Sequence, residues 1–353
     1  MPKISVLIPS YNSADFIEEC IKSVVNQSLE NIEILCIDAN SNDGTLKILQ
    51  EYALKDKRIQ IILSDRKSFG YQLNLGIQNA KGKYFTIVES DDYVDLTMCE
   101  KLWRLAEICD CDMIKADIFG FEKGIFGRNF KYLSMARVGF GSKVYGKVSI
   151  PKEEKEIIKY TWTMNQSGIY KLDFVRKFSI YANETDGASY QDFGLWFLMM
   201  ANANSVYFHK EALYFYRQDN QNSSVNNKNK VYCVCDESKF VENYIKINQK
   251  DDMEQIFLYR KFKLYLWNLK RIDKKFKLEF LEHFGKEFKN KKLDSNVFNK
   301  NELKEIKEII NNPKSFLKRQ KSFLWKIEKN FARWRRKFIG ICETSSKKYS
   351  FKG

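Results

Sequence analysis

The chain has 353 residues, of which 44% are hydrophobic and 15% aromatic, with only 4 prolines and 16 glycines. This composition supplies a buried core and excludes disordered, collagen-like and low-complexity chains. At about 150 residues per domain, the length indicates two domains or one large domain with an extension. No apolar run reaches the roughly 18 residues of a membrane-spanning helix, and the N-terminal run is too short for a secretory signal. We therefore expect a cytoplasmic protein.

Positive charge is concentrated at the C-terminal end of the chain. The formal net charge is +15, and residues 314–353 alone carry 13 Lys or Arg against two acidic residues. Apolar residues recur there at three- and four-residue intervals, which predicts one amphipathic helix. Aromatic and aliphatic residues opposite Lys and Arg are typical of a helix at an anionic membrane surface, and we favour this interpretation for 314–341. Packing on the protein itself and contact with nucleic acid are the alternatives.

Eight cysteines and two histidines do not predict a zinc site. The pairs Cys109–Cys111 and Cys233–Cys235 have one intervening residue rather than the roughly two to four of zinc knuckles. Neither histidine is close to these pairs in the sequence. We expect reduced thiols in the core or at the surface.

The first 120 residues alternate short apolar runs with amphipathic segments, which indicates an α/β fold with a mostly parallel sheet. Strands are predicted at 4–8, 32–37, 59–63, 84–88 and 113–119. Helices are predicted at 16–25, 45–55, 71–80 and 96–109.

The remaining sequence changes character twice. Residues 120–160 are rich in glycine and predict an irregular excursion over the sheet. A further helix is predicted at 192–201, and strands are predicted near 169, 206 and 214. An Asn/Ser/Lys-rich linker follows at 218–230. We divide the chain into an α/β domain at 1–225, a helical region at 226–312 and a basic helical tail at 313–353.

Acidic residues follow two of the predicted strands. Asp38 ends the second strand, and Glu89, Asp91 and Asp92 follow the fourth. Ligands of open α/β sheets bind at this edge. Three carboxylates within four residues repel one another unless a cation or hydrogen-bond donors compensate. Oxygen ligands suit Mg²⁺ or Mn²⁺, which commonly join carboxylates to a substrate diphosphate, whereas a solvated acidic turn is the alternative.

Several other chemistries lack their sequence signatures. No G-x-G-x-x-G follows the first strand, and no G-x-x-x-x-G-K-[ST] occurs in the chain, so these dinucleotide and triphosphate loops are not indicated. Two histidines in unrelated contexts leave little choice of base for a Ser-His-Asp arrangement. A metal-held nucleotide diphosphate with a carboxylate base is the chemistry that remains.

Four segments in consistent order resemble the signatures of glycosyltransferase family 2. They are ISVLIPSYN at 4–12, IDANSNDGT at 37–45, ESDDYV at 89–94 and GASYQD at 187–192. The resemblance covers about 1–225 and implies the GT-A fold, a Rossmann-like, mostly parallel twisted sheet with inverting chemistry. The Gln-x-x-Arg-Trp motif of processive synthases is not found, which implies that one sugar is added per encounter.

The resemblance also implies roles for residues of the donor site. Pro9, Tyr11 and Asp38 would line the nucleotide-base pocket, and Glu89 would lie near the ribose.

Four further residues receive roles in metal binding and catalysis. Asp91 would hold the metal on the diphosphate, with Asp92 supporting it. Asp192 would act as the general base on the acceptor hydroxyl, and Arg217 would reach the donor phosphates or the acceptor.

The implied function is the Mg²⁺- or Mn²⁺-dependent transfer of one sugar from a nucleotide-diphosphate sugar, preferably a UDP-sugar. The acceptor would be a glycan or lipid-linked molecule of the lipooligosaccharide or capsule kind. The protein would sit peripherally on the inner face of the cytoplasmic membrane, with no nucleic-acid partner. Tyr160, Trp162 and Trp196 could stack on sugar rings, although aromatic residues in an apolar stretch more often pack in the core.

Two other functions compete with this interpretation. A sugar-phosphate nucleotidyltransferase would need a Gly-rich basic loop after the first strand, where this chain has Ser10-Tyr11-Asn12-Ser13. A non-catalytic basic protein that binds membrane or nucleic acid would leave Glu89, Asp91 and Asp92 unexplained.

Overall fold

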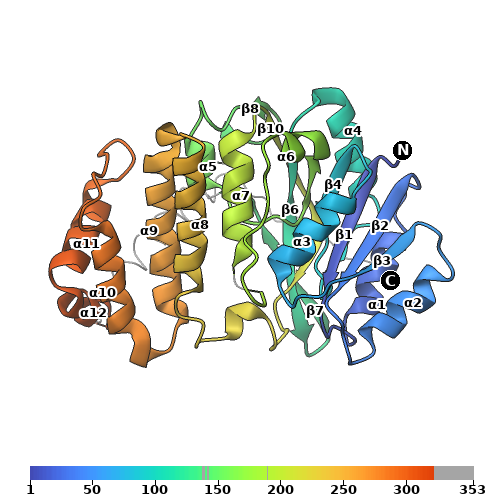
Figure 1. The fold of residues 1–353 in the computed structure, drawn as a ribbon, viewed down its shortest axis with the longest axis horizontal. Coiled ribbons are helices and arrows are strands. Elements are labelled where there is room, and N and C mark those ends of the chain that lie inside the picture. The colour runs from blue at the N-terminus through green and yellow to red at the C-terminus, as the bar shows by residue number, and fades with distance from the viewer. Residues whose placement is uncertain (137–139, 141–142, 189, 322–353) are drawn as a thin grey trace.

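A computed structural model describes residues 1–136, 140, 143–188 and 190–321. Its centre is one mixed sheet in the order β3-β2-β1-β4-β9-β6-β10-β5 (Figure 1). These strands are β1 (Ile4–Ser10), β2 (Ile32–Asp38), β3 (Ile59–Leu63), β4 (Tyr84–Ile87), β5 (Tyr93–Val94), β6 (Met113–Gly124), β9 (Gly168–Lys171) and β10 (Val206–Arg217). The strands β3, β2, β1 and β4 are mutually parallel, whereas β9 runs antiparallel to β4 and β6.

Helices between the strands cover the sheet and complete the predicted α/β domain. Every residue of β1 and of β2 is buried, as expected for the continuous apolar runs of parallel strands covered on both faces. The helices of this part are α1 (Ile17–Val25), α2 (Thr45–Ala53), α3 (Phe69–Asn79), α4 (Met98–Cys109), α5 (Glu156–Tyr160), α6 (Leu172–Lys177) and α7 (Gln191–Asn202). The predicted fold class is therefore confirmed.

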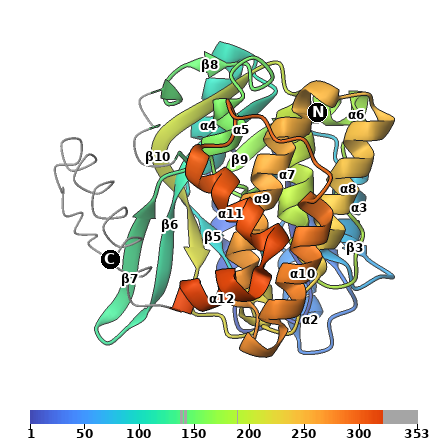
Figure 2. The same ribbon diagram turned by 90° about the vertical axis from the view of Figure 1, so that its left-hand side faces the viewer.

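The prediction of an irregular segment from 120 onward was wrong at its start. β6 continues to Gly124 and forms a hairpin with β7 (Gly127–Leu133), in which Gly124 pairs with Gly127. The glycines flank a two-residue turn, and Gly127 has a φ of +121°, which favours glycine. This hairpin projects from the sheet in Figure 2. A short strand, β8 (Val148–Ser149), pairs with β10.

The two strands predicted near 206 and 214 are one strand, β10. Its register against β6 shifts between His209 and Ala212 and again between Ala212 and Tyr214. These irregularities break the alternation that indicates a continuous strand in the sequence.

A helical region follows the sheet and lies at one end of the molecule (Figure 1). It consists of α8 (Cys233–Ile247), α9 (Glu254–Arg271), α10 (Lys277–Phe288), α11 (Lys300–Asn311) and α12 (Pro313–Lys321). The region has an aromatic core in which Tyr265 contacts Phe280 and Phe284, with ring centroids 5.5 and 5.1 Å apart. α8 packs against α7 and so joins this region to the sheet domain.

Only the start of the predicted membrane-binding helix is described. Phe316 in α12 is fully buried, so this first turn of the apolar stripe packs on the helical region, in which α12 contacts α10 and α11. The rest of the predicted 314–341 helix, from residue 322 on, lies outside the described residues. Among the described helices, none is both long and apolar enough to cross a bilayer.

Gly70 allows α3 to approach the segment that leads into α7. A Cβ at Gly70 would lie 1.9 Å from the backbone oxygen of Asn183. We expect Gly70→Ala to lower the free energy of unfolding by about 1–3 kcal/mol, the usual cost of overpacking, measured by urea denaturation. Gly76→Ala in the same helix is the control, because the three atoms nearest to its Cβ would be side-chain methyl groups of Ile37 and Leu7, at 3.1–3.2 Å. An equal loss in both variants would contradict the assigned backbone clash.

Candidate active site

The ends of β1 and β2 form the predicted nucleotide-binding edge. Asp38 pairs in register with Ser10 and is fully buried. Its carboxylate accepts hydrogen bonds from Ser10 Oγ (2.8 Å), Ser41 N (2.8 Å) and Ser41 Oγ (2.7 Å). Pro9 is buried within β1, whereas the Tyr11 ring is exposed and its hydroxyl accepts a bond from Lys67 Nζ (2.8 Å). Asp38 therefore fixes the shape of this edge, and Tyr11 is its accessible aromatic ring.

The three acidic residues that follow β4 do converge. One carboxylate oxygen from each of Glu89, Asp91 and Asp92 lies within 4.8 Å of the others. Burial, and then the charges of Asp192, Asp92 and Asp91, raise the pKa of Glu89 well above its ordinary value. Burial and the charge of Asp91 also raise the pKa of Asp92 well above its ordinary value. The carboxylates of the cluster repel one another, and a bound cation would relieve this repulsion. Their oxygen atoms are ligands that suit Mg²⁺ or Mn²⁺.

Asp91 and Asp92 have different environments. Asp92 is buried, and its carboxylate accepts bonds from the Tyr214 hydroxyl (2.7 Å) and from Arg217 N (2.7 Å). Asp91 accepts a bond at Oδ2 from Asn220 Nδ2 (2.8 Å), and no described residue donates a hydrogen bond to its Oδ1. Asp92 therefore ties the cluster to the end of β10, and Asp91 has the more available carboxylate.

Asp192 faces the acidic cluster from the first turn of α7. It lines a cavity of about 580 Å³ together with Glu89 and Gln166. Burial raises the pKa of Asp192 to about 6, opposed by a hydrogen bond from Asn165 and by the charge of Lys115. Tyr190, just before α7, has a φ of +70°. Residues from distant segments thus meet in one cavity. Ser189, within the predicted motif, lies outside the described residues.

The helical region supplies one wall of this cavity. Trp162 and Tyr216 line it from the sheet domain, and Lys263, Leu264 and Trp267 line it from α9. The side chains of Trp162 and Trp267 are each 38% exposed, so both indoles are accessible to a ligand. The α9 residues were missed in the sequence, because Lys- and Phe-rich helices carry no motif that places them beside a sheet edge.

Two of the three predicted sugar-stacking residues lie elsewhere. Trp196 is 1% exposed and packs in the core, with the Arg260 guanidinium 5.0 Å from its ring centroid. Trp196 thus has the more common role of an aromatic residue in an apolar stretch, because α7 is buried along nearly its whole length. Tyr160 packs against Phe140, with ring centroids 5.2 Å apart, and does not line the Asp192 cavity. Of these three residues, only Trp162 lines the Asp192 cavity.

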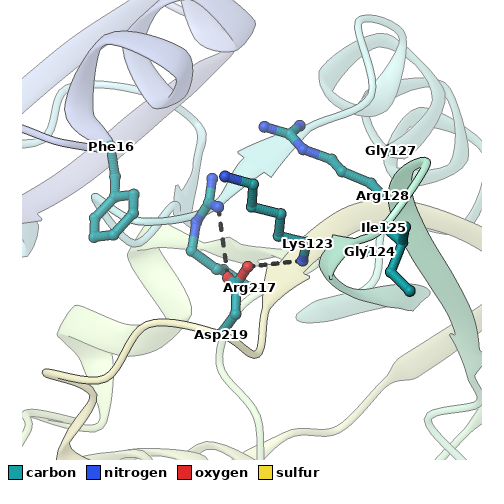
Figure 3. A pocket seen from close by; sticks show the side chains of 8 residues that line it. All are labelled: Phe16, Lys123, Gly124, Ile125, Gly127, Arg128, Arg217 and Asp219. Carbon is teal, nitrogen blue, oxygen red and sulfur yellow. Dashed lines mark hydrogen bonds and ion pairs between the residues drawn. The ribbon is translucent and has the colours of Figure 1, made fainter.

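Arg217 lies beside the acidic cluster and lines a second cavity, of about 540 Å³ (Figure 3). Its guanidinium lies between the rings of Phe16 and Phe121, 4.7 and 4.6 Å from their centroids. It donates from Nε to the backbone oxygen of Asp91 (2.7 Å) and from Nη2 to Glu19 Oε2 (2.8 Å). Arg217 therefore fixes the Asp91 backbone. It does not line the Asp192 cavity.

A second group of metal-type ligands occurs in the helical region, where the fold brings His283 close to Cys235 although the two are distant in the sequence. Ligand atoms of Cys235, His283 and Glu287 lie within 4.8 Å of one another. However, Lys261 Nζ is 2.7 Å from Glu287 Oε2 and already compensates its charge. Burial raises the pKa of Cys235 to about 12, which disfavours the thiolate that binds metals. We interpret this group as a polar contact between α8, α9 and α10.

Fold and site together define a sheet domain of the GT-A type, with an acidic cluster at the carboxyl edge and a carboxylate opposite. The family model for "Glycosyl transferase family 2" matches residues 5–173. Residues 5–173 therefore match the family that the sequence motifs resemble.

Curated relatives share the N-terminal part of the chain. GlyG of Streptococcus pneumoniae serotype 4 is 33% identical over 121 residues, which are 34% of this chain and 40% of that protein. The putative glycosyltransferase EpsH of Bacillus subtilis is 34% identical over 105 residues, 30% of each chain. A poly(ribitol-phosphate) beta-glucosyltransferase of Bacillus spizizenii is 29% identical over 228 residues, 63% of this chain and 34% of that protein. This chain thus spans well under half the length of these relatives.

Solved structures share the fold over a longer stretch. S. aureus TarS 1-349 in complex with UDP-GlcNAc superposes with a TM-score of 0.62 at 18% identity, covering 84% of this chain and 82% of that one. The uncomplexed TarS 1-349 gives a TM-score of 0.58, covering 80% of this chain and 79% of that one, also at 18% identity. The similarity therefore includes part of the helical region as well as the sheet domain.

The unequal environments of Asp91 and Asp92 can be tested by parallel substitutions. We expect Asp92→Asn to lower the melting temperature. Each oxygen of the buried Asp92 carboxylate accepts a hydrogen bond, and the asparagine amide has only one oxygen that can accept. Asp91→Asn should leave the melting temperature within about 2 °C but weaken Mn²⁺ binding at least about tenfold by calorimetry. If Asp91→Asn were the more destabilising change, the division of roles would be wrong.

Proposed function

We propose that this protein is a metal-dependent inverting glycosyltransferase that moves one sugar from a UDP-sugar to a hydroxyl group of a glycan or lipid-linked acceptor. The observation that carries this proposal is that Asp192 and Glu89, a member of the acidic cluster, line the same cavity. Asp192, the base for the acceptor, and the acidic cluster, the site for the leaving group, would thus lie on two sides of the same cavity. The proposal includes peripheral binding to an anionic membrane surface through 314–341.

The donor is proposed from the site and from the neighbouring structure. The exposed ring of Tyr11 lies next to the Asp38 edge, where an aromatic side chain can stack on a nucleotide base. A TarS structure of the same fold contains UDP-GlcNAc, which supports a UDP-sugar for this chain. Asp91, supported by Asp92, would hold Mg²⁺ or Mn²⁺. When bound, that ion would supply positive charge to the departing nucleoside diphosphate.

Asp192 would perform the proton transfer. A hydroxyl group is a poor nucleophile until a positioned base removes its proton. With a pKa raised to about 6, the Asp192 carboxylate is ionised at neutral pH and is a stronger base than an ordinary aspartate. Direct displacement at the anomeric carbon needs this one base and inverts the configuration, whereas retaining double displacement needs a second carboxylate as nucleophile.

The acceptor would lie between the sheet domain and α9. The exposed indoles of Trp162 and Trp267 in that cavity suit the apolar faces of sugar rings. The Bacillus spizizenii relative is named for a poly(ribitol-phosphate) acceptor, which supports an acceptor from the bacterial envelope. Lipooligosaccharide or capsule precursors fit the same chemistry.

The role of Asp192 predicts the effect of its removal. Asp192→Asn should reduce sugar transfer by about 10²-fold or more, the usual scale for loss of a general base, while UDP-sugar binding persists. The wild-type transfer rate should fall as pH drops below about 6, because the protonated carboxyl group cannot accept a proton. Initial rates between about pH 5 and 9 measure both effects. Asp173→Asn, an exposed aspartate in the first turn of α6, is the control and should retain activity.

The same variant has an expected effect on stability that does not require activity. The folded state raises the pKa of Asp192 from its ordinary 3.8 to about 6, so the folded protein binds this proton more tightly than the unfolded chain. The free energy of unfolding should therefore fall as pH rises from about 4 to about 6 and stay lower above that range. Asp192→Asn should melt higher than wild type at about pH 8, with the difference vanishing below about pH 4. A lower melting temperature at pH 8 would contradict this account.

The metal requirement predicts that EDTA abolishes transfer and that added Mg²⁺ or Mn²⁺ restores it. Donor turnover with a panel of UDP-, GDP- and dTDP-sugars, with and without chelator, measures this requirement together with nucleotide preference. Full activity in excess EDTA would exclude the metal role of Asp91 and Asp92.

A further inference from the structure

One short segment contacts both sides of the candidate active site. Residues 164–167 belong to the connection between α5 and β9, and Asn165 and Gln166 within them are buried. Asn165 Nδ2 donates to Asp192 Oδ1 (3.1 Å) and to the Asp192 backbone oxygen (3.2 Å). Gln166 Nε2 donates to Glu89 Oε1. Because the two amides belong to consecutive residues, this segment links Asp192 to Glu89 through two hydrogen bonds.

A buried lysine holds this segment in place. Lys115 lies in β6 and is only 2% exposed. Its ammonium donates to the backbone oxygen of Met164 (2.9 Å), to that of Gln166 and to the Tyr170 hydroxyl (3.0 Å). The Tyr170 hydroxyl in turn donates to the backbone oxygen of Asn165 (2.5 Å). All three donors of the ammonium are used, and the two carbonyl groups that accept from it belong to Met164 and Gln166, the residues on either side of Asn165.

The neighbouring backbone is shaped to admit the Lys115 side chain. A Cβ at Gly168 would lie 2.7 Å from Lys115 Cδ and 2.6 Å from the backbone oxygen of Ile114. Ser167 has a φ of +58°, and its hydroxyl contacts the backbone oxygens of Ala116 (3.0 Å) and Asp117 (3.1 Å). Glycine at 168 and the left-handed backbone at 167 therefore bring the segment onto β6 around the lysine.

Core packing does not explain a lysine at this position. Among the described residues, no carboxylate forms an ion pair with Lys115, and burial lowers the pKa of its ammonium to about 7. A buried charge without an ion-pair partner is costly, and an apolar side chain of similar length would avoid the cost. This cost indicates that Lys115 has a role other than packing. Its contacts with Met164, Gln166 and Tyr170 indicate that it holds the segment 164–167 in place.

The two amides also leave acceptors available for a ligand. Ionised carboxylates only accept hydrogen bonds, so the amide nitrogens of Asn165 and Gln166 face them. Asn165 Oδ1 and Gln166 Oε1 are then buried, and no described residue donates to either. Gln166 lines the Asp192 cavity, where a sugar hydroxyl could supply the missing donor.

We propose that Lys115 is a positioning residue that holds segment 164–167 so that Asn165 and Gln166 keep Asp192 and Glu89 correctly spaced across the cavity. Lys115 acts through these two amides and does not line the cavity itself. The inference rests on the proposed function, in which Asp192 is the base. It adds three residues outside the motifs of the family resemblance to the machinery of the site.

Lys115→Met tests this inference. We expect kcat for transfer to fall at least about tenfold, because small misplacements of a catalytic group cost rates of this order, with KM for the UDP-sugar within about twofold. The acid limb of the rate profile should also move to higher pH, because the Lys115 charge lowers the pKa of Asp192. The ionisable groups facing Asp192 are Lys115 of β6, Glu89 after β4, Tyr170 of β9, Tyr216 of β10 and Glu237 of α8.

Lys261→Met provides a matched control in the helical region. Lys261 is 3% exposed and pairs with Glu287 and Glu242, away from the Asp192 cavity. This variant should lose stability but keep the wild-type kcat and acid limb. Gln166→Leu removes the hydrogen bond to Glu89 without altering Lys115. It should lower kcat as Lys115→Met does, and it keeps the test valid if Lys115→Met fails to fold.

The outcomes separate the two proposals. If Asp192→Asn abolishes transfer while Lys115→Met and Gln166→Leu retain wild-type kcat and acid limb, the positioning role is wrong and the proposed function stands. If the wild-type protein turns over no nucleotide sugar, the proposed function fails. The position of Asp192 can then be judged from a ¹³C carboxyl titration by NMR, in which an unchanged Asp192 pKa in Lys115→Met would overturn the inference.

Discussion

The structure depends on how negative charge is accommodated at the carboxyl edge of the sheet. Burial and the charges of neighbouring carboxylates oppose the ionisation of Glu89 and Asp92, and burial opposes that of Asp192. The chain compensates part of this cost with neutral donors, among them the Tyr214 hydroxyl and the amides of Asn165 and Gln166. Neutral donors stabilise carboxylates without cancelling their charge, so the site retains a repulsion that a cation would relieve and a carboxylate, Asp192, of raised pKa.

The residues around the cluster divide structural and chemical tasks. Asp92 and Arg217 connect the turn after β4 to the end of β10 and to α1, and both are largely enclosed by protein. This framework holds the backbone of Asp91 while its carboxylate stays accessible. Ion pairs near an active site can therefore hold the backbone in place rather than bind a ligand. The sequence motifs alone do not distinguish these two roles.

The helical region is part of the site as well as a neighbour of the sheet domain. α9 lines the Asp192 cavity with Lys263, Leu264 and Trp267, and α8 packs on α7, which carries Asp192. A division of the chain at 225 remains a useful description of composition, but the cavity crosses that boundary. If the acceptor binds as proposed, differences in this wall would alter acceptor binding while leaving the donor edge unchanged.

The sequence by itself determined the α/β class, the order of the early strands and helices, and the acidic turn after β4. These features depend on local periodicity and on short motifs, which can be read within about ten residues. The hairpin at 124–127 was missed because its flanking glycines resemble an irregular segment. Only the tertiary structure decided that Lys115, Asn165 and Gln166 join Asp192 to Glu89, that Trp196 is core, and that α9 walls the cavity. Such contacts join residues from separate segments, and their partners are chosen by packing of the whole chain rather than by any local pattern.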